Sequence, residues 1–294
     1  MDYLDEITLS KKIQKAEPFS IVLGAALTSE VEGKGIPGVE RVPDFVFDFI
    51  KSKDDIEDYQ QAISSKTSQD KYQASLQYVS DMYGQNAVNT IINEVVRSNI
   101  DKKTGKSFIP AAIKGLAKLI EIGKIKSILT TNFDTLIEEE LDNLDIKYNS
   151  ISIVSDSNIT TNSNNLPTIV HLHGKWNEGD TMHTQSQLNN NRDKIQNSIR
   201  SIISKENIYI MAYGGWEDSF TRTLANIVHD NDANYDISWC FYNSDPVYLD
   251  KTSKELFTKL SPAIQRGRVK FFKGINCHSI FTKINIEKAK KKHK

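Results

Sequence analysis

Two stretches of the chain place polar side chains directly after short apolar runs. They are Ile128-Leu-Thr-Thr-Asn-Phe-Asp134 and Val170-His-Leu-His-Gly174. The amide of Asn132 can hold a hydroxyl group or a water molecule, because it both donates and accepts hydrogen bonds. The imidazole of His173 can accept a proton near neutral pH. If the two runs are parallel strands of one sheet, their carboxyl ends meet at the edge where ligands bind. The pair therefore indicates acid–base chemistry on a bound hydroxyl group or water.

Both motifs also have structural explanations. Asp134 or Thr135 can cap a helix that starts there, with Glu138 as the capping-box partner of Thr135. A lone histidine at a strand end is more often structural than catalytic. Capping does not account for Asn132, however, which lies before the helix. The coincidence of Asn132 with His173 at a second strand end favours a functional site.

Three further apolar runs end in small or polar residues. Phe19–Leu23 opens into Gly24-Ala-Ala-Leu-Thr28 and then Gly35-Ile-Pro-Gly38, a later run leads into Tyr213-Gly-Gly-Trp-Glu-Asp218, and another is followed by Asn243. Small residues let a backbone approach a ligand closely and turn its N–H groups toward a phosphate. The dinucleotide pattern G-x-G-x-x-G is absent because position 26 is Ala. Asp218 is expected to cap the helix that follows it.

The elements that must position these residues alternate between short apolar runs and helix-length segments. Runs of four to six mostly apolar residues without clean alternation are typical of strands buried on both faces. The sequence therefore predicts an α/β domain with a mainly parallel sheet. The predicted strands are 19–23, 126–129, 168–171, 208–213, 237–242 and 268–272.

The region 50–119 contains no convincing strand. Apolar residues recur there at helical spacing, as in the face made by Val88, Ile91, Ile92, Val95 and Val96. We interpret 50–119 as a helical insertion in a core formed by 19–49 and 120–275, with 1–294 as a single domain.

The composition excludes several classes of protein. Of 294 residues, 38% are hydrophobic and 26% are charged, which is typical of a soluble globular protein. The net charge of −1 argues against direct binding of nucleic acid by this domain. No apolar run reaches the roughly 20 residues that cross a membrane. With only two cysteines, Cys240 and Cys277, we expect a cytoplasmic protein.

In chain order, the motifs resemble those of the sirtuin-like family, in its bacterial NAD-hydrolysing branch. The resemblance extends over about 19 to 245 and implies a Rossmann-like fold that takes NAD⁺ as substrate. It implies that Asn132 positions the ribose and the attacking water, and that His173 acts as general base. It also implies a cofactor-binding set, in which Asn243 serves the adenine-side ribose: Gly24, Ala25, Ala26, Thr28, Ile36, Pro37, Thr131, Asp134, Gly214, Trp216 and Asn243.

The chain departs from the family pattern in four respects. Ala26 stands where the family has a second Gly, and Thr28 stands where it has Ser. Protein deacylases of the family carry Asp-Phe-Arg after Gly-Ile-Pro, but this chain continues with Gly38-Val-Glu40. They also carry a four-cysteine zinc module, which two distant cysteines cannot build. We therefore expect the helical insertion to replace the zinc module, and we expect no metal.

These motifs predict an NAD⁺ glycohydrolase that releases nicotinamide and ADP-ribose. By analogy with the NAD-hydrolysing branch, it would be the effector domain of an antiphage defence system. The analogy implies a homo-oligomer and a fused or separate sensor, such as a STAND ATPase, an Argonaute-like protein or a HerA-like ATPase. Two alternatives stay open: a zinc-free, NAD-dependent protein deacylase, and a non-catalytic module that senses NAD or ADP-ribose.

Overall fold

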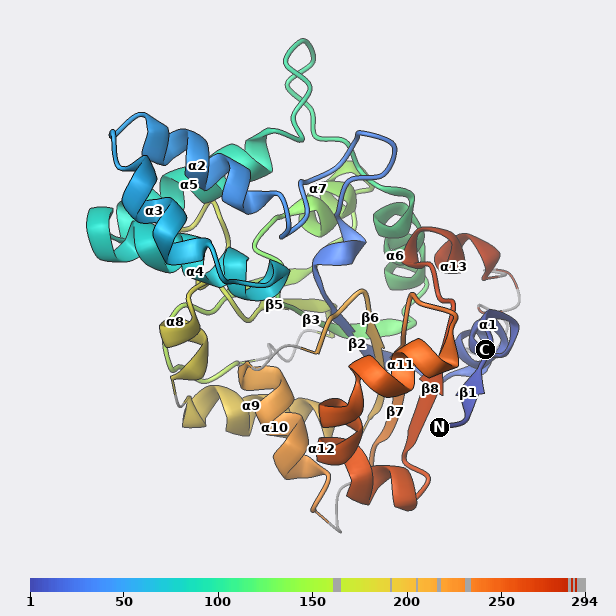
Figure 1. Cartoon of the computed structure of the whole chain (residues 1–294). Coiled ribbons are helices and arrows are strands. Elements are labelled where there is room, and N and C mark those ends of the chain that lie inside the picture. The colour runs from blue at the N-terminus through green and yellow to red at the C-terminus, as the bar shows by residue number, and fades with distance from the viewer. Residues whose placement is uncertain are drawn as a thin grey trace.

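One eight-stranded sheet forms the centre of the molecule (Figure 1). The computed structural model describes residues 1–160, 165–190, 192–204, 206–215, 218–230, 234–284, 287 and 289. The strands lie in the order β1-β8-β7-β6-β2-β3-β5-β4, and every neighbouring pair is parallel. Their bounds are β1 Tyr3–Leu4, β2 Phe19–Leu23, β3 Ile125–Thr130, β4 Asn149–Ser152, β5 Thr168–His171, β6 Asn207–Met211, β7 Asp236–Cys240 and β8 Val269–Phe272.

The predicted α/β fold with a mainly parallel, Rossmann-like sheet is confirmed, and all six predicted strands are present. Three of them were predicted too long, because β6 ends at Met211, β7 ends at Cys240 and β8 begins at Val269. The strands β1 and β4 were not predicted. Both are edge strands, and neither has the continuous apolar run that a central strand needs: β1 has two residues, and β4 reads Asn-Ser-Ile-Ser.

Helices cover both faces of the sheet because alternate strand residues point to opposite faces. Ile21 and Leu23 pack into one hydrophobic core, while Val22 between them packs into the other. The first core includes residues of α1 (Glu6–Lys15), α6 (Ala111–Glu121), α7 (Leu136–Asn143) and α13 (Cys277–Lys283). The second includes residues of α9 (Asp193–Ile203), α10 (Ser219–Ile227) and α12 (Lys254–Gln265).

The direction in which successive strands are added to the sheet reverses next to β2, although all strands stay parallel. From β2 the chain adds β3, β4 and β5 on one side, and it then returns to place β6, β7 and β8 on the other side. In open parallel sheets, ligands bind outside the carboxyl ends of the strands at this kind of switch point. The loops that follow β2, β3, β5 and β6 therefore lie where a ligand is expected.

Four helices between β2 and β3 pack mainly with one another: α2 (Val42–Lys51), α3 (Ile56–Ile63), α4 (Ser68–Tyr83) and α5 (Gln85–Arg97). They form the group at the upper left of Figure 1. The predicted face of α5 is confirmed, because its five apolar residues are all buried. The predicted limits 50–119 stay a prediction, and α2 and α6 each cross one of them.

Three short helices complete the fold: η1 (Ala25–Leu27), α8 (Gln185–Asn189) and α11 (Pro246–Thr252). Within the described ranges, every helix is too short or too polar to span a bilayer.

Candidate functional site

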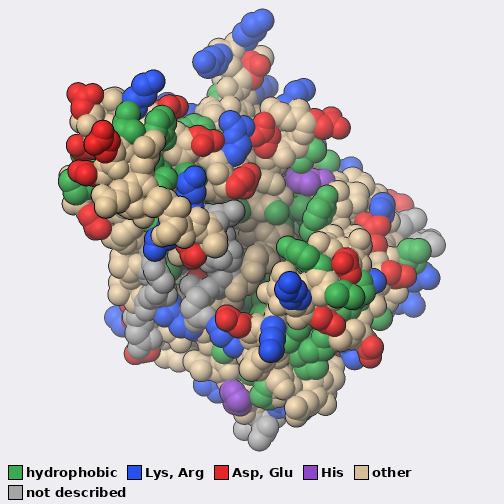
Figure 2. Space-filling model, viewed as in Figure 1, with side chains coloured by type: hydrophobic (Ala, Val, Ile, Leu, Met, Phe, Trp, Pro, Cys, Tyr) green, Lys and Arg blue, Asp and Glu red, His purple; other side chains and the backbone are tan. Residues whose placement is uncertain are grey.

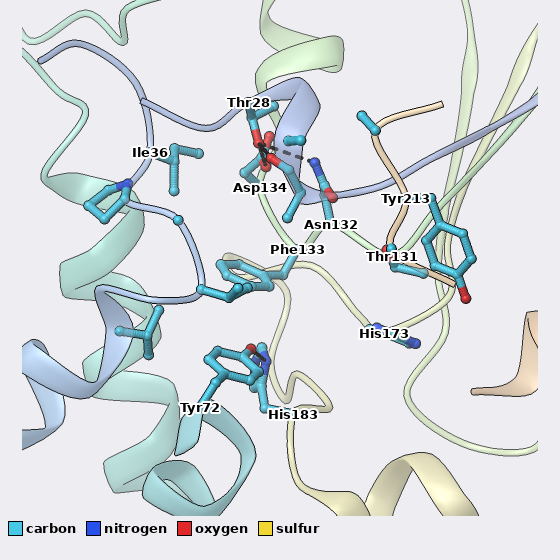
Figure 3. Close-up of a pocket in the computed structure, with 18 of the residues that line it drawn as sticks. Thr28, Ile36, Tyr72, Thr131, Asn132, Phe133, Asp134, His173, His183 and Tyr213 are labelled. Atoms are coloured by element: carbon cyan, nitrogen blue, oxygen red, sulfur yellow. Dashed lines mark hydrogen bonds between the residues drawn. The ribbon is translucent and has the colours of Figure 1, made fainter. Parts of the chain in front are cut away.

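A cavity of about 250 Å³ lies between the carboxyl ends of the strands and the insertion helices. In the space-filling view the surface is hollowed between the insertion and the core (Figure 2). Figure 3 shows the residues of the cavity, which come from the ends of β2, β3, β5 and β6 and from α2 and α4.

Ten of the predicted site residues line this cavity together. They are Ala25, Ala26, Thr28, Ile36, Pro37, Thr131, Asn132, Asp134, His173 and Gly214. Gly24 and Asn243 are described but are not part of the lining, and Trp216 lies outside the described residues. The strand-end motifs therefore meet in one place.

A chain of hydrogen bonds orients the side chain of Asn132. The Thr28 hydroxyl donates to Oδ2 of Asp134 over 2.8 Å, and Nδ2 of Asn132 donates to the Thr28 oxygen over 3.1 Å. A carboxylate only accepts hydrogen bonds, and a hydroxyl has one hydrogen to give. The ionised Asp134 therefore receives the hydroxyl hydrogen, and Thr28 accepts from the NH₂ end of Asn132. Oδ1 of Asn132 must then be the free end.

Oδ1 of Asn132 is buried and has no hydrogen-bond partner among the described residues. Asn132 is 6% exposed, and its backbone is held on both sides: its N–H donates to the Thr130 hydroxyl over 3.0 Å, and its carbonyl pairs with Nδ1 of His171 over 2.8 Å. A buried acceptor without a partner costs roughly 1–3 kcal/mol. An orphaned, rigidly held acceptor that lines a cavity is suited to a ligand hydroxyl group or a water molecule.

Asp134 is buried, and burial raises its pKa from 3.8 to about 6. The hydrogen bond from Thr28 and the one from the N–H of Leu136, at 3.2 Å, oppose this rise by stabilising the charge. Asp134 therefore bonds the first turn of α7, as one structural explanation predicted. The same carboxylate also fixes the direction of the bonds that orient Asn132, so the two explanations do not exclude each other.

His173 lies across the cavity from Thr28 in Figure 3, beside Thr131 and Tyr213. Burial lowers its pKa below 6.5, whereas the carboxylate of Asp218 and a hydrogen bond with the Thr131 backbone act in the opposite direction. Nε2 of His173 is 3.7 Å from Oδ2 of Asp218, which is too long for a hydrogen bond. The imidazole is thus kept mostly neutral, next to an acid that can stabilise it once it is protonated.

Asp218 also fulfils the predicted capping role. It is the N-cap residue of α10, and its side chain accepts from the N–H groups of Phe220 and Thr221. The Tyr213 hydroxyl donates to its second oxygen over 2.8 Å. These bonds hold the carboxylate still beside His173.

Gly174 makes a sharp turn directly after His173. Its φ of +84° lies in the left-handed region, and a Cβ at this position would be 2.4 Å from the carbonyl oxygen of Asp180. The chain then folds back, and the N–H of Met182 donates to the carbonyl of His173 over 2.9 Å. This return places His183 on the wall of the same cavity.

The loop after β2 differs from the expected phosphate-binding turn. The N–H groups of Gly24, Ala26, Leu27 and Thr28 already donate to backbone carbonyls. Gly24 instead permits close packing, because a Cβ there would be 2.4 Å from the carbonyl oxygen of Ala212. The small residues of this loop let the ends of β2 and β6 meet beside the cavity.

Asn243 contributes to a turn. Its Oδ1 accepts from the N–H of Asp245 over 2.7 Å, and its carbonyl accepts from the N–H of Gly274 over 3.0 Å. This arrangement supports the start of α11, and no contact in the described residues connects Asn243 to the cavity. The role predicted for Asn243 at an adenine-side ribose stays a prediction.

His171 and His173 contact different residues. Nε2 of His171 pairs with the Glu138 carboxylate over 2.7 Å, and Nδ1 pairs with the Asn132 carbonyl. Both ring nitrogens therefore face acceptors. The proposed capping box of Thr135 with Glu138 is wrong, because Thr135 makes no capping bond and Glu138 binds His171 and Ser150. His171 is a structural residue that holds the backbone of Asn132.

Several residues that line the cavity were not among the predicted site residues. Phe133, Tyr213, Tyr72, Met182, His183 and Leu188 lie on the wall of the cavity. Tyr72 belongs to α4 of the insertion, and its hydroxyl is 2.6 Å from Nδ1 of His183. Phe133 and Tyr213 lie inside the recognised strand-end motifs, but Tyr72 and His183 are 111 positions apart and belong to no motif.

The described residues contain no group of three His, Cys, Asp or Glu side chains that could hold a metal ion. Cys240 and Cys277 are both buried and unpaired. The cavity itself presents amide, imidazole and carboxylate groups, from Asn132, His173 and Asp134 among others.

The fold and cavity define an α/β protein with a cavity at the switch point of a parallel sheet. Residues 126–260 match the family model of the SIR2-like domain. The matched segment is thus similar to a SIR2-like domain, and it carries Asn132, Asp134 and His173. A search of curated proteins gave no match.

Solved structures of Sir2 homologues are also similar to this chain. A Sir2 homologue mutant in complex with ADP-ribose has a TM-score of 0.46 and 10% identity, with 98% of each chain covered. A Sir2 homologue in complex with NAD has a TM-score of 0.42 and 10% identity, with 99% of this chain and 97% of the other covered.

Proposed function

We propose that the protein is an NAD⁺ glycohydrolase. The observation that carries the proposal is the buried, orphaned Oδ1 of Asn132 in the same cavity as the mostly neutral imidazole of His173. Binding alone needs no base, whereas hydrolysis needs an acceptor to hold water and a base to remove its proton. The match of residues 126–260 to the SIR2-like domain supports NAD⁺ as the substrate.

In the proposed reaction, the bond between the nicotinamide nitrogen and C1′ of the ribose breaks. Nicotinamide takes the bonding electrons, and positive charge builds on the ribose. A water molecule held by Oδ1 of Asn132 adds to C1′, and His173 takes one of its protons. Asp218, whose Oδ2 is 3.7 Å from Nε2, stabilises the imidazolium that forms. The products are nicotinamide, ADP-ribose and a proton.

The test is a direct assay of NAD⁺ with the purified protein, following nicotinamide and ADP-ribose. Asn132→Ala and His173→Ala should each lower turnover by about 10²–10⁴-fold, the usual effect of losing a positioned acid–base group. Asn143→Ala and His229→Ala replace exposed residues of the same types and serve as matched controls. Near-normal turnover by either cavity variant, under the conditions that activate the parent, would refute the assignment.

The same assay separates the alternatives. A zinc-free deacylase would release nicotinamide only when an acyl-lysine peptide is present. A sensing module would bind NAD⁺ or ADP-ribose and release no nicotinamide.

We further propose that the activity is held in check until the protein self-associates or a sensor acts, as in an effector of antiphage defence. The size of the cavity supports the proposal that the activity is held in check. Its volume of about 250 Å³ is below the ~300–1,000 Å³ of pockets that enclose a whole small-molecule ligand. A dinucleotide would need the insertion helices and the core to move apart. The resemblance of the motif set supports the antiphage role.

A further inference from the structure

His183 is a buried histidine that the proposed reaction does not use. It is 2% exposed and lines the cavity, and no residue that the structure describes forms a hydrogen bond with its Nε2. Its other nitrogen is 2.6 Å from the hydroxyl of Tyr72, which is 4% exposed. A buried ring nitrogen without a hydrogen-bond partner destabilises the folded protein. A polar group of a bound ligand could supply the missing hydrogen bond.

The surroundings of His183 are apolar. Phe133 packs edge-on against its ring, with centroids 5.0 Å apart and planes at 82°. Tyr72 contacts it in the same manner at 6.1 Å and 83°. In Figure 3 the ring of Phe133 lies between this pair and the group formed by Thr28, Asn132 and Asp134. The remaining lining residues contributed by the insertion, by the segment before it and by the loop of His183 are Ile36, Pro37, Gly38, Val39, Val42, Met182 and Leu188.

The residues around His183 favour an uncharged ligand group over an anionic one. Burial lowers the pKa of His183 to about 3, so the imidazole is neutral and offers one hydrogen bond. A phosphate or a carboxylate placed there would lose its hydration without gaining a cation, which is costly. A flat, uncharged aromatic group with an amide fits better. Its ring packs against Phe133 and Tyr72, and a carboxamide pairs with either tautomer of His183, because it both donates and accepts.

We infer that His183, oriented by Tyr72, is the residue that recognises the leaving base: an uncharged aromatic carboxamide. This inference rests on the proposed function, in which that base is nicotinamide. The base departs next to Asn132 and His173, and His183 lines the same small cavity, on the side supplied by the insertion. The insertion thereby contributes to specificity as well as to covering the site.

A purely structural role for His183 must be separated from recognition. The segment of His183 is tied to the insertion by other bonds as well: Asn89 donates to Asp180 over 2.8 Å, and Gln85 donates to the carbonyl of Thr181 over 3.2 Å. Asn89→Ala removes one such tie outside the cavity. It is therefore the matched control for a variant that only loosens this segment.

The experiment measures binding of free nicotinamide and of ADP-ribose by ligand-observed NMR, for the unaltered protein, His183→Ala, Tyr72→Phe and Asn89→Ala. Loss of one neutral hydrogen bond should weaken nicotinamide binding by roughly 3- to 10-fold in His183→Ala. Tyr72→Phe should weaken it less, since only the orienting hydroxyl is lost. ADP-ribose binding should stay within about twofold in both, and Asn89→Ala should match the parent for both ligands.

A second measurement needs no variant, in case His183→Ala does not fold. Nicotinate has the same ring with an anionic carboxylate, and the unaltered protein should bind it at least about 10-fold more weakly than nicotinamide. Equal binding of the two would overturn the inference. So would nicotinamide binding that His183→Ala leaves unchanged, or that Asn89→Ala weakens equally.

The outcomes also separate this inference from the proposed function. If nicotinamide binding depends on His183 but NAD⁺ is never cleaved, the recognition role stands and the hydrolase proposal fails. If NAD⁺ is cleaved and the unaltered protein does not bind nicotinamide, the recognition role fails alone. If His183→Ala weakens binding of AMP and leaves nicotinamide unaffected, the subsite belongs to the adenine base and the inference is refuted.

Discussion

Asp134→Asn should make the protein more stable and less active at neutral pH. The carboxyl group of Asp134 has an ordinary pKa of 3.8, and burial raises it to about 6. The folded protein therefore holds this proton more tightly than the unfolded chain does. Protonated Asp134 therefore contributes to the free energy of unfolding. This contribution is fully present below about pH 4 and is lost as the pH rises through about 6. The two pKa values differ by about 2.2, and each unit corresponds to about 1.4 kcal/mol, so ionisation costs the folded state at most about 3 kcal/mol.

The effect on activity follows from hydrogen-bond direction. One oxygen of Asp134 accepts from the N–H of Leu136, so the amide of an asparagine would keep its oxygen there and turn its NH₂ toward Thr28. The Thr28 hydroxyl would then donate elsewhere. Its other neighbouring acceptor, the Ala25 carbonyl, is at 3.4 Å, whereas the Asn132 amide is at 3.1 Å. Asn132 would turn over to accept this bond and would present NH₂ to the cavity in place of Oδ1.

The assay combines urea unfolding between pH 4.5 and 8 with NAD⁺ cleavage at pH 7.5. At pH 7.5 the free energy of unfolding should rise by up to about 3 kcal/mol, and the gain should shrink as pH falls below 6. Loss of the acceptor should lower kcat/KM by about 5- to 150-fold, which corresponds to about 1–3 kcal/mol. Thr28→Ser keeps the hydroxyl and is the control. A variant that is less stable at pH 7.5, equally active there, or stabilised by a constant amount at all pH values would refute the reasoning.

Three further outcomes are expected. Because burial lowers the pKa of His173 below 6.5, its neutral form persists as pH falls. NAD⁺ cleavage should therefore stay constant from pH 8 to about 7 and should decline only as Asp134, whose pKa is about 6, becomes protonated, whereas a decline that starts above pH 7 would contradict this. Chelators should leave cleavage unchanged, since no metal-binding group is found among the described residues, and zinc lost together with activity would contradict this. Cleavage per protomer should rise with protein concentration if self-association opens the cavity, whereas constant, high activity of a dilute monomer would argue against such control.

The central strands could be predicted from the sequence because both of their faces are buried. Phe19–Leu23 has five consecutive buried residues, and such a run is visible without any knowledge of its neighbours. The edge strand β4 has four half-buried residues, two of them Ser and one Asn, so its pairing depends on β5 and is not encoded locally. The ends of the strands were predicted less accurately than their positions in the sequence. The apolar run of β6 continues past Met211, but Ala212 adopts a positive φ of 55° and leaves the sheet.

The candidate site could be predicted as far as it lies on strand ends. Asn132, Asp134 and His173 follow parallel strands, and the geometry of a parallel sheet brings such ends to one edge. The orientation of Asn132 could not be predicted, because it depends on Thr28, 104 positions away in the sequence. The hydrogen bond between Tyr72 and His183 could not be predicted from the sequence either. It exists only because the insertion folds back over the loop that follows β5.

The carboxylates that line the cavity lie at one end of it, and this arrangement suits the proposed reaction. The carboxylates of Asp134 and Asp218 are on the wall near Asn132 and His173, whereas His183 and Tyr72 at the other end are neutral and surrounded by apolar side chains. During cleavage, positive charge leaves the nicotinamide ring and builds on the ribose. Carboxylates stabilise a cation that develops beside them, and an apolar subsite favours the base once it has become neutral. If the proposed reaction takes place here, both ends of the cavity favour the same movement of charge, and the site would bind the transition state more tightly than the substrate.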